Sequence, residues 1–537
     1  MATPALAPPG SRGRRRSVAA SRLEAWGPAA LAALAAASAV SIRVWFLLTP
    51  QAFPNGDEAV TGLMVGRILH GHLYAFFAGQ SYNGALNQYL QALMYVVLPL
   101  PMDAFTLRLV MVAEAAVDCW LIYLIGKRML ASRWHAALAA LLFALGPYWN
   151  VWYGVRSYGS NYAGALVVAL AGLYCALRVT GDRGGSPWWS AGFGLCCGLA
   201  VWLGFTGAYL LVPAGVWLLA AAVRSRTVVP AAVGGFVVGS APVTIWMALN
   251  RHLVSLGGPQ PFTTVAQRWH RLSGPIVREW LGLGYVNDVG GWSPHLRSAA
   301  VAALALAWVV AVVVRRRGLL DLLTLRASHR GPIDVLLLAV PVVVAFFVSS
   351  RYAWGVGAPR YLFVAYPILA LGLAALVPRR PALGAPAALA ITAGLAGTSM
   401  AMLSHHTGSA RAPAPSQLEA TADYLAGHHE GHVYSDYWTG MPLQYVAGDG
   451  LTVAVMGAGS DRVPERDRDV DHASKWVYVA STGSNNSLTA TRRALDAHHV
   501  RYHEARVGLI YVFDHLHPLL RPWQLGLAPP PTRSAAR

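Results

Sequence analysis

Charged side chains are scarce in this chain. Only 12% of its 537 residues are Asp, Glu, Lys or Arg, whereas a soluble domain carries about 25%. Hydrophobic residues make up 55% of the sequence, and they gather in long runs that recur along most of its length. Runs of this kind are typical of proteins embedded in a lipid bilayer. The composition therefore excludes an ordinary soluble protein and predicts a multi-pass membrane protein.

Lysine and cysteine are also rare. Lys127 and Lys475 are the only lysines, so arginine supplies nearly all of the basic charge behind the formal net charge of +18. The arginines stand in short clusters between apolar runs, as topology signals do. We therefore expect no nucleic-acid partner. All four cysteines lie inside apolar runs, so no disulfide framework is expected: Cys119, Cys175, Cys196 and Cys197.

Eleven apolar runs are candidates to cross a bilayer core, which takes about 20 helical residues. They are 26–48, 104–126, 136–150, 161–178, 188–203, 205–223, 228–249, 298–314, 333–349, 360–377 and 382–403. With a cytoplasmic N-terminus, every predicted cytoplasmic loop holds at least two basic residues, as the positive-inside rule requires. We therefore expect about eleven transmembrane helices in the cytoplasmic membrane. A further run, 85–101, is either an interfacial or a membrane-embedded helix.

This topology places the longer polar segments on the extracytoplasmic side. Two of them, 50–103 and 250–297, are loops of the membrane region. The third begins at residue 404, and through residue 518 its strands and helices alternate, which predicts a small extracytoplasmic α/β domain. The Pro/Ala/Arg-rich segment 1–25 is expected to be a disordered cytoplasmic arm, and the Pro-rich segment 519–537 a disordered tail.

The segment FPNGDEAVTGLMVGRILHGH (53–72) follows the first apolar run closely. Its apolar residues recur at helical spacing, which predicts an amphipathic helix at the membrane interface. Asp57 and Glu58 stand at its N-terminus. Helix physics alone explains them, with Asp57 as the N-cap and Glu58 complementing the helix dipole. A second role stays open, because few other acidic residues face outside before the C-terminal domain.

The order of features around this segment resembles the GT-C glycosyltransferases. A hydrophobic helix with Arg43 near its outer end is followed by the Asp-Glu pair and then by the interfacial helix. The similarity is to the bacterial branch related to protein O-mannosyltransferases and the lipid A aminoarabinose transferase. Three further stretches are similar to that branch: GQSYNGALNQYL (79–90), APRYLFVAYPILA (358–370) and HVYSDYWTGMPLQYVAGDGLTVA (432–454). By this resemblance, residues 26–403 form a transmembrane GT-C-like catalytic domain.

The resemblance implies transfer of a sugar from a polyprenyl-phosphate donor to an envelope glycan, lipid or protein on the extracytoplasmic face. Asp57 would be the general base that takes the proton of the attacking hydroxyl, with Glu58 supporting it. The sequence departs from the family at Asn87 and Gln88, where relatives often carry an acid.

Arginine suits the donor phosphate, because a guanidinium binds phosphate in a bidentate manner and stays charged near a bilayer. By resemblance and by their predicted place near the outer interface, the candidates are Arg360, Arg351 and Arg156. An interfacial anchor is the alternative for each of them. The residues expected to line the substrate are Arg43, Tyr82 and Tyr361.

Two other functional hypotheses compete with a transferase. A transporter or flippase of envelope lipids or glycans would show inverted repeats with broken helices, and the two halves show no such pairing. Glu114 and Asp118 share one helical face in an apolar run and would serve a proton relay, although an ion pair with Arg43 or Arg108 is the simpler interpretation. A non-catalytic scaffold would keep its function without Asp57.

No metal-ligand set is predicted. The motif HHEGH (428–432) misses the HExxH spacing by one residue, and the other histidine pairs are interpreted as solvated residues near helix ends. Some members of the resembling family use a divalent cation and others do not, so a cation requirement stays open. No phosphate-cradling glycine loop is present, and no nucleotide site is expected.

Overall fold

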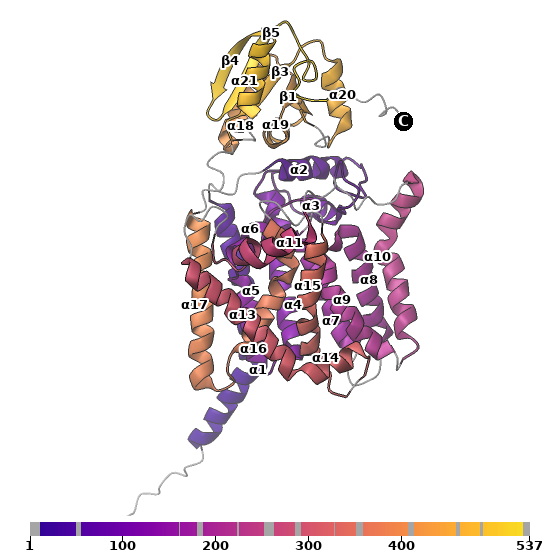
Figure 1. Ribbon diagram of the computed structural model, residues 1–537, viewed down its shortest axis with the longest axis vertical. Helices are drawn as coiled ribbons and strands as arrows, with labels where there is room; N and C mark the ends of the chain where they lie inside the picture. Colours follow the sequence, from indigo (N-terminus) through magenta and orange to yellow (C-terminus); the bar gives the residue numbers. More distant parts are fainter. Residues whose placement is uncertain are drawn as a thin grey trace, which may run out of the picture.

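The computed structural model is a bundle of helices that carries a small α/β domain at one end (Figure 1). It describes residues 11–49, 55–159, 162–179, 186–222, 225–251, 263–284, 292–326, 328–350, 358–405, 413–457, 462–483 and 487–529. Within these residues, eight helices are long and apolar enough to cross a membrane, and three shorter apolar helices accompany them. Together they coincide with the eleven predicted runs, which confirms a helical multi-pass membrane protein with a C-terminal α/β domain.

The bundle is built from helices of very different length, seven to 37 residues. They are α1 (Ser11–Leu47), α4 (Leu109–Met129), α5 (Arg133–Ala144), α6 (Tyr148–Gly154), α7 (Tyr162–Val179), α8 (Pro187–Leu203), α9 (Ala208–Ala222), α10 (Val228–Asn250), α13 (Pro294–Val314), α14 (Arg316–Leu323), α15 (Pro332–Ser349), α16 (Tyr366–Leu376) and α17 (Pro381–His405). Turns of 3-10 helix precede α4, α9 and α16: η1 (Thr106–Arg108), η2 (Phe205–Gly207) and η4 (Ala358–Ala365).

Glycine allows α8 and α10 to pack closely. Each helix carries two glycines four residues apart, Gly194 and Gly198 in α8 and Gly235 and Gly239 in α10. A Cβ atom at Gly198 would lie 2.4 Å from the carbonyl oxygen of Phe236, so no side chain fits there. In lipid, helices associate through such close contacts of small residues. The glycine pairs therefore fix the position of α10 against the rest of the bundle.

Two short helices lie across the end of the bundle that faces the α/β domain (Figure 1). They are α2 (Gly56–Leu69) and α3 (Leu86–Val97), and the segment between α10 and α13 adds α11 (Val265–Arg271), the π-turn η3 (Leu272–Ile276) and α12 (Val277–Trp280). The helix predicted after the first span is thus confirmed as α2. Its N-cap is Asn55 rather than Asp57, because the Asn55 side chain accepts from the Glu58 amide and the Glu58 carboxylate accepts from the Asn55 amide.

The run 85–101 forms the interfacial helix α3, which has 12 residues and is too short to cross a bilayer. Its polar side faces the protein, where Asn87, Gln88 and Gln91 are buried. Its apolar side is exposed, with Leu93 57% and Val96 72% accessible. A helix of this polarity is stable at the surface of a membrane, where lipid covers the apolar side.

The C-terminal domain is a five-stranded mixed sheet between helices. Its elements are α18 (Pro415–Gly427), β1 (His432–Ser435), α19 (Tyr437–Ala447), β2 (Thr452–Val455), α20 (Pro464–His472), β3 (Val477–Ser481), α21 (Ser487–Ala497), β4 (Arg501–Val507) and β5 (Ile510–His517). The strand order is β2-β1-β3-β5-β4, with β1 parallel to β2 and β3, and β5 antiparallel to β3 and β4. The predicted alternation of short strands and helices is confirmed.

Side chains of the central strands alternate between two apolar cores. Val477 and Val479 of β3 pack with α18 and α19, whereas Tyr478 and Ala480 pack with residues of α20 and α21. The first core extends beyond the domain, because it includes Val60 and other apolar residues of α2. The C-terminal domain therefore rests on α2 through its own hydrophobic core.

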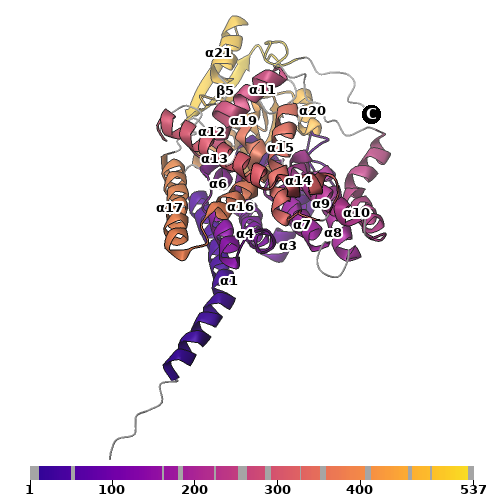
Figure 2. The same cartoon turned by 60° about the horizontal axis from the view of Figure 1, so that its bottom comes forward.

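Both expected disordered ends are partly folded. Residues 11–25 continue α1 below the bundle (Figure 2), since Ala, Leu and Arg favour helix. The tail is folded as far as residue 529. Arg521 donates hydrogen bonds to the carbonyl oxygens of Val470 and Ala473, and its guanidinium lies 3.6 Å from the centre of the Trp476 ring. One arginine thus ties the segment to the domain, which the Pro-rich composition did not indicate.

Candidate active site

Glu58 is completely enclosed at the end of the bundle that faces the C-terminal domain. Arg108 donates two hydrogen bonds of 2.7 Å to it, one to each carboxylate oxygen. Arg156 donates a third from 2.9 Å, and the backbone amide of Ser157 a fourth from 3.1 Å. Burial alone would raise the pKa of Glu58, but the attraction of the two arginines outweighs it and lowers the pKa to about 2. Glu58 is therefore ionised and joins α2 to the start of α4 and to the segment after α6.

Asp57 occupies a different environment from its neighbour. It is half-buried, and the Tyr437 hydroxyl at the start of α19 donates a hydrogen bond of 2.5 Å to its Oδ1. Burial and the nearby Asp57 raise the pKa of Tyr437, so the hydroxyl keeps its proton and donates it. One oxygen of Asp57 is thus oriented by the C-terminal domain.

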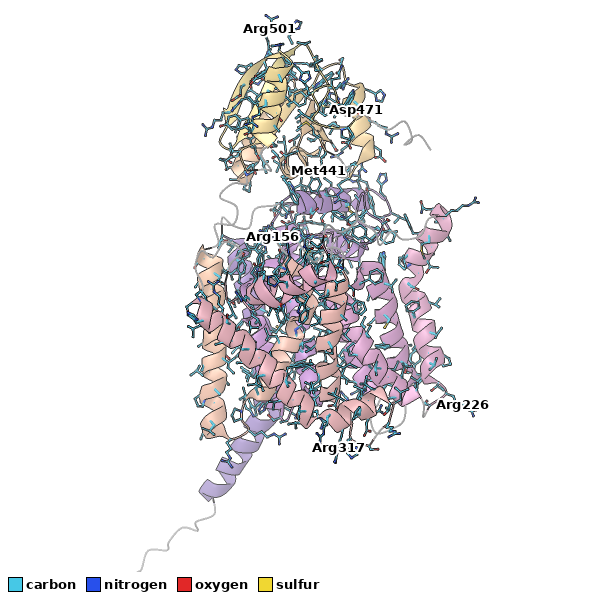
Figure 3. The ribbon with its side chains drawn as sticks, viewed as in Figure 1. Arg156, Arg226, Arg317, Met441, Asp471 and Arg501 are labelled. Atoms are coloured by element: carbon cyan, nitrogen blue, oxygen red, sulfur yellow. The ribbon has the colours of Figure 1, made fainter. Side chains whose placement is uncertain are left out.

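The contact between α19 and α2 depends on a glycine. A Cβ atom at Gly62 would lie 2.2 Å from the Tyr445 ring, and the Tyr445 hydroxyl donates to the carbonyl oxygen of Met102. Figure 3 shows Met441 of α19 on the face of the domain that meets this layer. The close approach of α19 brings Tyr437 into reach of Asp57.

Arg462 supports Tyr437 from the other side. Its guanidinium lies 5.6 Å from the centre of the Tyr437 ring and 5.7 Å from that of Phe77. It also donates a hydrogen bond to the carbonyl oxygen of Gly79. A cation over an aromatic ring is attracted to its face. Arg462 thus links Tyr437 to the loop between α2 and α3.

Tyr153 of α6, Tyr162 of α7 and Tyr158 between these helices pack together on the bundle side of the site. The ring centres of Tyr153 and Tyr158 are 6.1 Å apart, and those of Tyr158 and Tyr162 are 6.3 Å apart. Burial raises the pKa of Tyr158, on which the charges of Arg156, Glu58, Asp57 and Arg360 also act. Tyr158 therefore lies within the electrostatic reach of Asp57 and Arg360, the two residues that the resemblance assigned to the acceptor and to the donor phosphate.

Arg360 has few partners within its reach. One of its terminal nitrogens donates to the Tyr361 hydroxyl at 3.0 Å, and its Nε is buried without a hydrogen-bond partner among the described residues. Those residues also place no carboxylate in an ion pair with it. Arg156, by contrast, is committed to Glu58. Of the two arginines, Arg360 is the one with donors available to an anion.

The remaining predicted residues have different positions. Arg351 lies outside the described residues, and Tyr82 is half-buried between α2 and α3. Arg43 is fully buried. It donates hydrogen bonds to the carbonyl oxygens of Ala39 and of Asn150, and the second bond joins α1 to α6. Tyr361 is half-buried beside Arg360.

The carboxylates of α4 form no ion pair within the described residues. Glu114 accepts a hydrogen bond of 3.1 Å from Asn87, and one oxygen of Asp118 has no hydrogen-bond partner there. Of the two expected partners, Arg108 is held by Glu58, whereas the charge of Arg43 acts on Asp118 without an ion pair between them. The proximity of η1 to α2, which places Arg108 beside Glu58, is a tertiary contact that the sequence of α4 does not reveal.

Both oxygens of Glu58 are taken by arginines and by the Ser157 amide. Glu58 is therefore unsuited to share a divalent cation with Asp57. The residues that the sequence analysis missed are Tyr437 and Arg462 of the C-terminal domain. Tyr437 lies within the resembling stretch 432–454, but no local pattern shows that it reaches α2.

Comparisons with known proteins give matches only in structure. No protein-family model matches the sequence, and no curated protein matches it. The apo oligosaccharyltransferase of Archaeoglobus fulgidus superposes with a TM-score of 0.51 at 13% identity, covering 85% of this chain and 70% of that chain. AglB from the same organism, in complex with an inhibitory peptide and a dolichol-phosphate, gives 0.51 at 12%, covering 93% and 75%. ArnT from Cupriavidus metallidurans bound to undecaprenyl phosphate gives 0.46 at 14%, covering 90% and 98%.

Proposed function

We propose that this chain, which has the fold of the GT-C glycosyltransferases, transfers a sugar from a polyprenyl-phosphate-linked donor to an acceptor on the extracytoplasmic face of the cytoplasmic membrane. The observation that carries the proposal is the environment of Asp57. This carboxylate is accessible and oriented by Tyr437, while Glu58 beside it is sequestered. The dolichol-phosphate bound by AglB supports a lipid-linked donor.

Asp57 is the proposed general base. The acceptor hydroxyl attacks the anomeric carbon, the bond from that carbon to the phosphate oxygen breaks, and the lipid phosphate leaves with the electron pair. The proton of the hydroxyl passes to Asp57. Because Tyr437 holds Oδ1, the second oxygen is the one left to receive the proton. Glu58 does not titrate in this scheme; it holds the N-terminus of α2 in place.

Arg360 is the proposed ligand of the donor phosphate. Negative charge grows on the phosphate as it leaves, and a guanidinium stabilises that charge. Tyr361 orients the guanidinium, and the half-buried Tyr158 between α6 and α7 offers a face on which a sugar ring can stack. Arg351 remains a second proposed phosphate ligand, and Arg156 acts through Glu58.

The proposed orientation puts the N-terminus in the cytoplasm and the C-terminal domain outside. Figure 3 shows Arg226 and Arg317 at the end of the bundle opposite to the C-terminal domain, and α1 begins at that same end (Figure 1). Basic loops favour the cytoplasmic side. The site at Asp57 then faces outside, where a lipid-linked sugar is the available donor.

The test is transfer of radiolabelled sugar from a panel of polyprenyl-phosphate sugars, with membranes that carry wild-type protein or variants. We expect Asp57→Asn to lower kcat by about 10²–10⁴-fold. Arg360→Gln should raise the KM for the donor, and Arg360→Lys should restore it only in part. Asp449→Asn, which changes an exposed carboxylate of the C-terminal domain, is the matched control and should keep full activity. Equal transfer by wild type and Asp57→Asn would remove Asp57 as the base, and no transfer from any donor would favour the transporter hypothesis.

A further inference from the structure

Two histidines converge on one buried carboxylate in the C-terminal domain. The Nδ1 atoms of His503 in β4 and His515 in β5 each lie 2.8 Å from Oδ1 of Asp514. The three ligand atoms all lie within 4.8 Å of one another. Asp514 is completely buried, whereas the His503 and His515 side chains are 60% and 70% exposed. The cluster therefore opens to solvent on its histidine side.

The strand pairing is modified in a way that creates this cluster. His503 pairs directly with Asp514, and Arg501 with His517, so β5 contains one more residue than β4 over this stretch. The backbone of His515 is left-handed, with φ of 51°, which is unusual for a residue other than glycine. Neighbours in a regular strand point to opposite faces. The bulge turns the His515 side chain to the face of Asp514, and bulges commonly re-aim a side chain in this way.

The second oxygen of the carboxylate has a partner of its own. The Tyr424 hydroxyl in α18 donates a hydrogen bond of 2.8 Å to Oδ2 of Asp514. Metal-ligating side chains are usually oriented by such an outer hydrogen bond. Tyr424 thus fixes the carboxylate and leaves Oδ1 directed at the two histidines.

We propose that His503, Asp514 and His515 bind a divalent transition-metal ion, for which zinc is the fitting probe. Zinc bonds to histidine nitrogen and carboxylate oxygen at about 2.0–2.2 Å, which places the ligand atoms of a tetrahedral site about 3.3 Å apart. Both Nδ1 atoms lie 2.8 Å from Oδ1 of Asp514, and the three ligand atoms lie within 4.8 Å of one another, so movements of the exposed histidine side chains can bring them to this geometry. The ion replaces the protons that link the rings to the carboxylate, and a water completes the coordination.

The ion has a structural role, in which it links strands of the sheet, and takes no part in sugar transfer. It joins β4 to β5, which form one edge of the sheet, and through Tyr424 it holds α18. Figure 3 shows Arg501, where β4 begins, at the end of the molecule farthest from the membrane region. The site is therefore separate from Asp57, and the proposal does not depend on the transferase activity.

The test measures zinc bound by the full-length protein in detergent, after removal of any affinity tag and treatment with a chelator. We expect wild type to retain one more zinc per chain after dialysis than His503→Gln or His515→Asn, where asparagine tolerates the left-handed backbone. Zinc should also raise the apparent melting temperature of wild type but not that of the two variants. His498→Gln, an exposed histidine of the same domain, is the matched control and should bind as wild type does.

The three exposed histidines can be replaced without opening the core, so loss of binding will not reflect unfolding. The proposal is overturned if wild type, His503→Gln and His515→Asn bind the same amount of zinc, or if wild type binds none at micromolar concentration. Either result would show that the cluster is only a hydrogen-bonded triad. As a second measure, cobalt should give the intense visible absorption of a tetrahedral site in wild type and not in the variants.

Discussion

Replacing Glu58 with glutamine should destabilise the protein far more than replacing Asp57 with asparagine. The pKa of Glu58 falls from 4.5 to about 2 in the folded protein, and each pKa unit corresponds to about 1.4 kcal/mol. Ionised Glu58 thus contributes about 3 kcal/mol at neutral pH. Because the folded pKa lies below the unfolded value, this contribution is present above pH 4.5 and is lost as the pH falls towards 2. Glu58→Gln removes the carboxylate but leaves Arg108 and Arg156 buried without it.

Thermal unfolding in detergent, followed by tryptophan fluorescence, measures the difference. We expect Glu58→Gln to lower the apparent melting temperature by several degrees, since removing one partner of a buried ion pair costs about 3–5 kcal/mol. Asp57→Asn should change it little. Adding Arg108→Gln to Glu58→Gln should recover part of the loss, because it removes one uncompensated charge. Equal melting temperatures for Glu58→Gln and wild type would refute the anchoring role of Glu58.

Two further predictions concern the contacts of α19 and α10. Tyr437→Phe should lower kcat about tenfold with little change in the KM for the donor, because it removes the hydrogen bond that orients Asp57. The control Tyr445→Phe loses only a hydrogen bond to a backbone carbonyl and should stay near wild type; equal kcat values for Tyr437→Phe and wild type would contradict the role of Tyr437. Gly198→Leu should lower the yield of folded protein, since the new side chain meets the backbone of α10, whereas Gly234→Leu, with open space around it, should express as wild type. Size-exclusion profiles in detergent measure both yields, and equal profiles for the two variants would contradict close packing of α8 and α10.

The parts of this fold that were predictable are those set by local sequence. Apolar runs near the length of a bilayer predicted the eleven helices, because no other regular structure can satisfy the backbone of a single segment in lipid. The alternation of short strands and helices predicted the C-terminal domain. Helix periodicity also placed Asp57 and Glu58 at the N-terminus of α2, and the resemblance assigned them a role.

What could not be predicted rests on contacts between distant segments. Tyr437 and Asp57 are 380 residues apart in the sequence, and the local sequence around either residue does not predict their contact. Arg108 seemed a partner for the acids of its own helix, but tertiary packing brought it to Glu58. The metal-ligand cluster was missed for a similar reason, because only a bulge places His515 on the same face as Asp514.

The hydrophobic core that α2 shares with the C-terminal domain sets the unit that can be exchanged between proteins. A chimera that joins the membrane bundle of this chain to the outer domain of a relative would leave Val60 and Met64 facing a foreign surface. The same graft would also separate Asp57 from its tyrosine. A chimera can keep this core only if α2 and the C-terminal domain come from the same parent protein, although almost the whole bundle lies between them in the sequence. Substitutions in α2 and in the C-terminal domain should therefore be correlated among related proteins.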